Sequence, residues 1–266
     1  TLGAPTGLWT VAASGNVSID YSYAVKLFVA AGVTATLTAA SYIRTVAGTG
    51  VIALGNNLLG VNYPTAANNY WTFTGTVTAG ASGSVLIGAS ASCTNDTINI
   101  PGISLTVAGT ATKVLTIRLL TCAALLVEAG GAGVVGLTVP EKLVAADVYV
   151  GSAGTANRGG ALVLAGVAVI TSLAKGTNNT AANTVTFTSA YVQVATSITG
   201  GANITFRSTT ADTTHIEGKG TATLTNMAVD NAVHAHNFAN FGAGNTNVDH
   251  NVYAAPWSQA LCGAGV

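Results

Sequence analysis

The residues from Val17 to Val29, VSIDYSYAVKLFV, alternate with a period of two. Every odd position is apolar or aromatic, whereas the even positions are polar apart from Ala24 and Phe28. Such alternation is typical of a β-strand with one buried and one solvated face. At about 3.3 Å per residue, a single strand of this length would span roughly 40 Å, far beyond the usual strand of about 5–6 residues. The sequence therefore predicts a very long strand near the N-terminus, with its odd-numbered side chains buried.

The rest of the chain also has the pattern of short strands. Thr alternates with Val, Ile, Phe or Leu in most segments, and β-branched residues favour a pleated, half-buried surface. Tyr70–Ala79 and Ser84–Cys93 alternate in this way, and the ASG turn at 81–83 between them predicts a hairpin. Ala123–Glu128 is the best candidate for a helical turn.

These patterns predict an all-β fold, a β-sandwich or jelly roll with a long N-terminal strand. No internal period is clean enough to predict a solenoid. We expect residues 1–30 to form a leader followed by the long strand, and residues 31–266 to form one β-sandwich domain.

Charge is unusually sparse. Only 7% of the 266 residues are charged and the formal net charge is zero, compared with about 25% charged residues in ordinary soluble domains. A chain without a basic stripe cannot displace counterions from phosphates, which argues against a nucleic-acid partner. No uncharged apolar run reaches the roughly 20 residues that a membrane-spanning helix needs.

The single methionine is Met227, and the chain begins at Thr1. We therefore expect that a secretory signal peptide has been removed and that the protein is extracellular. An extracellular location would permit a disulfide, and Cys93–Cys122 is the favoured pair because both residues lie in strand-like segments. Cys262 would then be free or would form an intermolecular bond.

All four histidines lie in the last quarter of the chain. On a strand, His234 and His236 would point to the same face, as the ligands of a metal ion do, and Asp249 or His250 could complete a site. The alternative is a polar loop with incidental histidines. Apart from such a metal ion, no cofactor is expected.

Signatures of catalysis are lacking in the sequence. It contains no G-x-S-x-G motif, no convincing pair of carboxylates, and no Gly-rich run between a strand and a helix. We therefore expect a protein that is not an enzyme. Four sequons mark candidate glycosylation sites at Asn16, Asn95, Asn178 and Asn203.

In composition, in the lack of an N-terminal pilin helix and in the segment GLWTVAASGNVSIDYSYAVKLFV, the chain resembles subunits of archaeal extracellular threads and bundling pili. Those filaments assemble by donor-strand complementation, in which one subunit's N-terminal strand completes the sheet of the next. The resemblance implies a glycosylated cell-surface filament of identical subunits in a head-to-tail helical polymer. The donor side chains would be the odd-numbered set: Val17, Ile19, Tyr21, Tyr23, Val25 and Leu27.

Two other functional classes remain open. A viral capsid jelly roll would also be poor in charge and self-associating. A secreted carbohydrate-binding or adhesive β-sandwich would use exposed aromatic side chains as a platform. The candidates for that platform are Trp9, Tyr63, Tyr70, Trp71 and Trp257.

Overall fold

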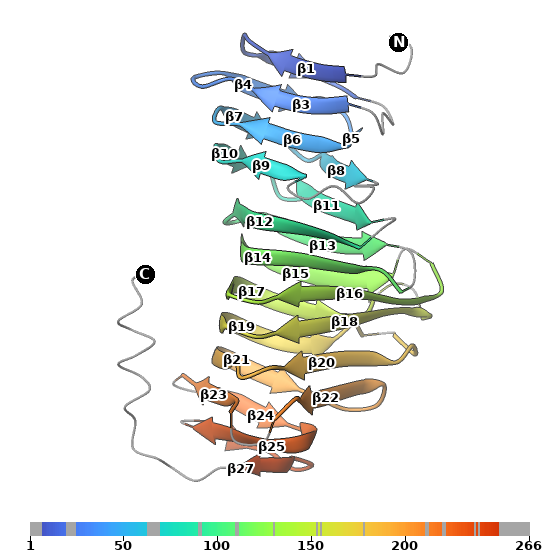
Figure 1. Ribbon diagram of the computed structural model, residues 1–266, viewed down its shortest axis with the longest axis vertical. Helices are drawn as coiled ribbons and strands as arrows, with labels where there is room; N and C mark the ends of the chain where they lie inside the picture. Colours follow the sequence, from blue (N-terminus) through green and yellow to red (C-terminus); the bar gives the residue numbers. More distant parts are fainter. Residues whose placement is uncertain are drawn as a thin grey trace.

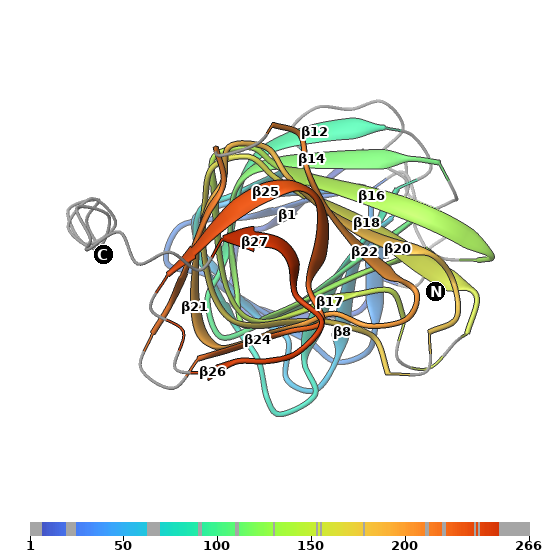
Figure 2. The ribbon, with the colours of Figure 1, turned by 90° about the horizontal axis from the view of Figure 1, so that it is seen from below.

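The protein is a rod of stacked parallel coils. The computed structural model describes residues 7–19, 25–62, 70–89, 92–109, 112–129, 131–152, 154, 156–177, 179–210, 213–219, 222–236, 238 and 240–249. Their strands follow one another along the rod from the N-terminal to the C-terminal end (Figure 1). Seen along the rod, the strands of successive coils superimpose around a common axis (Figure 2). The fold is therefore a β-solenoid, and the prediction of a β-sandwich or jelly roll is wrong.

Three sheets build the N-terminal part of the rod. The first contains β1 (Gly7–Val11), β3 (Val25–Val29), β6 (Thr45–Gly48) and β9 (Trp71–Phe73). The second contains β2 (Gly15–Val17), β4 (Thr34–Leu37), β7 (Val51–Ala53) and β10 (Thr76–Thr78). The third begins with β5 (Ser41–Ile43), β8 (Leu58–Asn62) and β11 (Ser84–Ala89) and continues into the C-terminal part.

Two interleaved ladders build the C-terminal part. One ladder continues from β11 through β13 (Ser104–Gly109), β15 (Ala124–Ala129), β17 (Lys142–Val150), β19 (Val167–Lys175) and β21 (Tyr191–Thr199). Different parts of β21 then pair with β23 (His215–Gly218) and with β24 (Thr223–Thr225), and β24 pairs with β26 (Asn240–Phe241). The other contains β12 (Cys93–Ile100), β14 (Val114–Cys122), β16 (Gly133–Val139), β18 (Arg158–Leu164), β20 (Asn183–Phe187), β22 (Ile204–Ser208), β25 (Ala228–His236) and β27 (Thr246–Asp249).

The core consists of apolar side chains stacked in register from coil to coil. The longest such row contains Leu59, Val85, Leu105, Leu125, Val148, Leu173, Ile198 and Leu224. These side chains are at most 1% exposed. The step between partners varies from 20 residues (Leu105 to Leu125) to 26 residues (Leu59 to Val85). Because the repeat length is irregular, the sequence has no clean period.

Three local predictions are also wrong. Residues 17–29 do not form one strand, because β2 pairs with β4 in the second sheet and β3 pairs with β1 and β6 in the first. The ASG segment at 81–83 turns a corner instead of closing a hairpin, since β10 pairs with β7 and β11 pairs with β8 and β13. The candidate helical turn Ala123–Glu128 is mostly strand β15.

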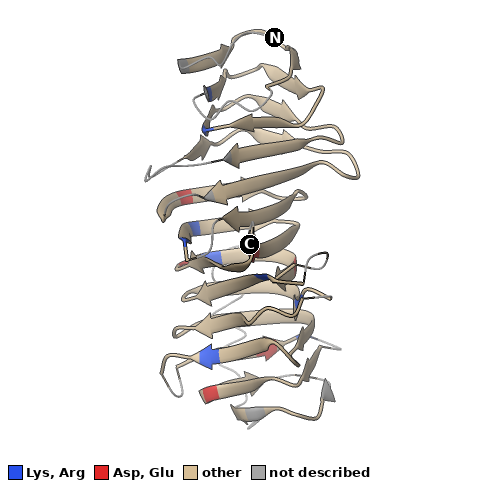
Figure 3. Cartoon of the chain, turned by 90° about the vertical axis from the view of Figure 1, so that its right-hand side faces the viewer, with Lys and Arg blue, Asp and Glu red and all other residues tan. Residues whose placement is uncertain are grey.

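The N-terminal strands belong to the same stack as the rest of the rod. Because β1 and β3 share a sheet with β6 and β9, the strand pairing marks no boundary at residue 30. In the part of the chain that the structure describes, no helix is long and apolar enough to cross a membrane. Charged residues are few and scattered along the rod (Figure 3).

Candidate functional site

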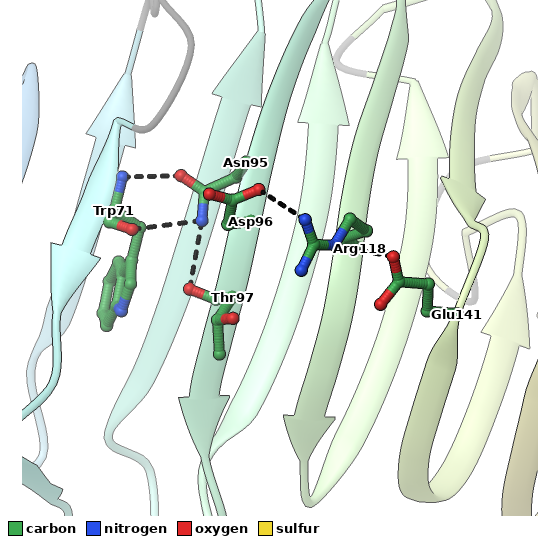
Figure 4. Close-up of polar contacts among 6 residues, drawn as sticks. All are labelled: Trp71, Asn95, Asp96, Thr97, Arg118 and Glu141. Atoms are coloured by element: carbon green, nitrogen blue, oxygen red, sulfur yellow. Dashed lines mark hydrogen bonds and ion pairs between the residues drawn. The ribbon is translucent and has the colours of Figure 1, made fainter.

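The backbone pairing between successive coils is interrupted between β9 and β12. The first sheet ends at β9, and β12 pairs with β14 on its other side. A side chain bridges the two strands instead of a backbone ladder (Figure 4). The backbone N–H of Trp71 donates to Oδ1 of Asn95 (2.8 Å), and Nδ2 of Asn95 donates to the carbonyls of Trp71 (3.1 Å) and Thr97 (3.0 Å). Asn95 is completely buried, and its side-chain amide takes the place of the backbone groups that a neighbouring strand would offer to Trp71.

A cleft of about 350 Å³ lies beside this bridge. Trp71 and Phe73 belong to its lining, but their side chains are only 2% and 4% exposed, and their rings meet edge to face within the core with centroids 6.3 Å apart. Its rim is polar and exposed, with side chains from both strands: Thr72, Thr74, Asp96, Thr97 and Asn99. A volume in this range is usual for a small-ligand site, but the two aromatic rings expose almost no surface to the cleft.

The core beside the cleft contains a buried donor. Trp71 is 2% exposed, and its Nε1 has no hydrogen-bond partner among the described residues. In Figure 4 the indole nitrogen lies on the side of the ring that faces Thr97. A buried N–H without an acceptor is unfavourable, but this one is sealed from solvent and does not open into the cleft.

An ion-pair chain leads away from the rim. Nη1 of Arg118 on β14 lies 3.4 Å from Oδ1 of Asp96, and its Nε lies 2.8 Å from Oε1 of Glu141 (Figure 4). All three side chains are about half-exposed, so each pair contributes at most about 1 kcal/mol. This series of ion pairs orients the Asp96 carboxylate more than it stabilises the fold.

The histidines meet on the outer side of the last coils. Tyr191, His215 and His234 are partners in the strand register, and their rings stack with centroids 5.5 and 5.0 Å apart. The ring of His236 lies 5.9 Å from that of His215 and 6.2 Å from that of His234. Burial, followed by the neighbouring His234 and His236, lowers the pKa of His215.

This arrangement does not resemble a metal centre. The three imidazoles are within about 21° of parallel, so their nitrogens do not converge on one point as tetrahedral coordination needs. Among the described residues, no group of three or more His, Cys, Asp or Glu side chains could hold a metal ion. Metal binding by His234 and His236 stays a prediction. The Asp249 side chain and His250 lie outside the description.

The proposed donor residues lie partly in the chain's own core. Val17, Ile19 and Leu27 are 8%, 4% and 2% exposed, and all three belong to the main hydrophobic cluster. Tyr21, Tyr23 and the Val25 side chain lie outside the described residues. The donor role stays a prediction, but Val17, Ile19 and Leu27 already have partners within their own subunit.

The expected disulfide is not formed, since Cys93 and Cys122 are both buried free thiols. In the register of β12 with β14, Cys93 is opposite Leu115, and Cys122 is opposite Ile100 at the other end. Seven residues of strand therefore separate the thiols by roughly 23 Å, whereas a disulfide needs Cα atoms within about 7 Å. Both cysteines lie in paired strands, but at opposite ends.

The four sequons differ in access. Asn95 cannot accept a glycan in the folded protein, because its amide is buried and fully hydrogen-bonded. Asn16 and Asn203 are exposed and stay candidates, and Asn178 lies outside the described residues. Among the proposed platform aromatics, Tyr70 and Trp71 are buried, Trp9 is partly buried, and Tyr63 and Trp257 are not described.

Sequence reasoning missed the asparagines that join adjacent coils. Besides Asn95, Oδ1 of Asn183 accepts from Gly160 N (3.0 Å), and Oδ1 of Asn245 accepts from Met227 N (3.0 Å). One signal could have identified Asn183: it shares the buried parity of Val185 and Phe187 in its strand. A polar side chain at a buried position must find hydrogen-bond partners.

Comparison of the chain with models of known protein families, with curated protein sequences and with solved structures finds no match.

Proposed function

We propose that this chain is a structural, non-enzymatic subunit of an extracellular cell-surface filament, in which identical copies stack end to end. The proposal rests on the orientation of β1 at the N-terminal end of the rod (Figure 1). In the described part of the chain, β1 pairs only with β3. Its opposite edge presents backbone donors and acceptors, and such an edge is a template for another strand.

The geometry of β1 identifies the groups involved. The carbonyl of Val11 accepts from Ala30 N, so Val11 and Trp9 direct their backbone groups to the β3 side. Alternate residues of a parallel strand face opposite neighbours, and Leu8 and Thr10 therefore direct theirs outward. Leu8 is also 64% exposed, an apolar side chain available to an adjoining coil.

Stacking at this edge would propagate. The N-terminal and C-terminal ends of the rod present different strands, so contact between them is heterologous and extends into a filament. The sparse charge of the chain gives little electrostatic repulsion against such contact. Exchange of the segment from Val17 to Leu27 is less favourable, because it would remove buried side chains from their own core.

Proline substitution at the outward positions tests the proposal. In Leu8→Pro/Thr10→Pro, the two outward N–H groups are lost while the groups facing β3 remain. We expect shorter filaments or monomers by negative-stain electron microscopy and light scattering. The matched variant Leu8→Ala/Thr10→Ala keeps both N–H groups and should retain more assembly. Wild-type protein that stays monomeric, or proline variants with filaments of wild-type length, would contradict end-to-end stacking.

A further inference from the structure

We propose that the solenoid continues through each junction between subunits: β1 of one copy pairs in parallel with β27 of the preceding copy, and Trp9 extends the core of that copy. This junction rests on the end-to-end stacking proposed above, and it assigns the surface that receives β1. The two strands lie at opposite ends of the rod (Figure 1). They are also the two ends of one face of the rod.

That face runs the length of the molecule. Its first part is the sheet of β1, β3, β6 and β9, and its second part is the ladder from β12 to β27. Asn95 on β12 joins the two parts by its hydrogen bonds to Trp71 on β9 (Figure 4). The pairs at both ends are parallel, β1 with β3 and β25 with β27. A copy added at the C-terminal end in the same orientation therefore places its β1 beside β27 and continues the parallel face.

The apolar core is only partly covered at both of these ends. Trp9 is partly buried, whereas Leu27 and Val46, the next two members of its row, are 2% and 0% exposed. Val248 is likewise partly buried, whereas its register partner Val233 is 0% exposed. Trp9 and Val248 are thus the terminal members of core rows, and among the described residues no further coil covers them. A second copy supplies that coil to both, since its last coil covers Trp9 and its first coil covers Val248.

The charges at the two ends favour contact between unlike ends. Residues 1–62 contain two cations and one anion, a net charge of +1: Lys26, Arg44 and Asp20. Residues 213–249 contain one cation and three anions, a net charge of −2: Lys219, Glu217, Asp230 and Asp249. Opposite charges attract when the N-terminal end of one rod meets the C-terminal end of another, whereas two like ends repel each other. The occupant of the β1 edge is therefore the C-terminal end of a second copy.

Truncation of Trp9 tests the shared core. Tryptophan is enriched among the residues that dominate binding at interfaces, so we expect Trp9→Ala to raise the protein concentration at which filaments first form by about tenfold or more. The matched control is Leu8→Ala, because Leu8 is exposed on the outer side of the same strand, and it should raise that concentration by less than about threefold. Light scattering measures assembly, and circular dichroism checks that both variants fold. Assembly of folded Trp9→Ala at the wild-type concentration would overturn the shared core.

Cross-linking tests the partner strand and does not depend on Trp9→Ala. In a Cys262→Ser background, the single variants Leu8→Cys and Asn247→Cys place a thiol at an exposed position of β1 and of β27. The native Cys93 and Cys122 are buried. We expect a short bismaleimide to couple the two variants to each other when they are mixed before assembly, and to couple neither variant to itself.

The outcomes separate the junction from the filament. Wild-type protein that stays monomeric would overturn both the filament and the junction. Filaments in which the mixed variants do not couple, or in which Leu8→Cys couples to itself, would overturn the junction while filament formation stands. Coupling between positions 8 and 247 within one chain of the double variant, at concentrations where no filament forms, would show that the ends meet inside a subunit and would also overturn it.

Discussion

Asn95 and Trp71 are joined by two hydrogen bonds between a side-chain amide and a backbone, N to Oδ1 at 2.8 Å and Nδ2 to O at 3.1 Å. The amide thereby connects two coils between which the backbone ladder is interrupted. The interruption has two consequences: on this face the coils are joined by one buried side chain, while the third sheet continues from β8 to β11, and space is left for the cleft.

Asn95→Ala should therefore destabilise the rod. The substitution removes hydrogen bonds to the backbone of Trp71 and to the Thr97 carbonyl, and it leaves buried groups without partners. We expect a loss of about 3 kcal/mol in the free energy of unfolding, measured by urea denaturation. Asn99→Ala, on the exposed face of the same strand, should change it by less than about 0.5 kcal/mol. Similar losses for the two variants would contradict the bridging role.

The stacked core predicts coupling between residues far apart in sequence. Leu125 and Val148 are register partners on β15 and β17, and both are fully buried. Leu125→Ala should cost about 2–5 kcal/mol in unfolding free energy, and its effect should be non-additive with that of Val148→Ala by about 0.5 kcal/mol or more. Leu59 lies three steps along the same row, so Leu125→Ala and Leu59→Ala should be additive within about 0.5 kcal/mol. Coupling of the distant pair and additivity of the adjacent pair would contradict the register.

The alternation of side chains allowed part of this fold to be predicted. It identified the all-β class and assigned Val17, Ile19 and Leu27 to buried positions correctly. It could not identify the partner of each strand, because the same alternation satisfies an antiparallel hairpin and a coil of parallel strands. The distinction depends on register between residues such as Leu59 and Val85, and the unequal steps conceal that register in the sequence.

The site was harder to predict than the fold class. Trp71 appeared as an exposed platform, but its side chain is buried in the core beside a cleft whose rim is made of short polar side chains. Those threonines resemble the others that alternate along the chain. They form a rim because the backbone ladder is missing between β9 and β12, where the Asn95 side chain replaces a strand partner. Asn95 and Trp71 are 24 residues apart in the sequence, and no local sequence pattern indicates their contact.

The two described thiols should be unreactive in the folded protein. Burial raises the pKa of Cys93 to about 11 and that of Cys122 to about 12, so almost no thiolate exists at pH 8. In a Cys262→Ser variant, we expect a thiol reagent such as DTNB to titrate neither thiol in native buffer and both thiols in guanidinium. A disulfide between Cys93 and Cys122 would leave no thiol even after unfolding, and fast reaction in native buffer would contradict their burial.

The histidine cluster should make the C-terminal coils sensitive to pH. The pKa of His215 is lowered in the folded protein from its ordinary value of 6.5, first by burial and then by His234 and His236. The unfolded chain therefore binds the proton at a higher pH than the folded chain does, and stability falls as the pH falls through about 6.5. Tyr191 stacks on the same imidazole, and Glu217 lies two residues along β23. We expect the protection of amides in β23 and β25, after correction for the intrinsic slowing of exchange at low pH, to be lower at about pH 5.5 than at about pH 7.5.

His215→Gln is the matched variant, because glutamine keeps a polar side chain of similar length but does not titrate in this range. It should reduce the difference in amide protection between the two pH values, since the His215 imidazole with its lowered pKa is no longer present to gain a proton. Measurement at about pH 5.5 keeps most carboxylates ionised, because their ordinary pKa values lie near 4. Amides of β15 and β17, far along the rod from the histidines (Figure 1), provide an internal reference. A pH effect of the same size in β15 as in β25, or one unchanged by His215→Gln, would show that the histidine cluster is not its source.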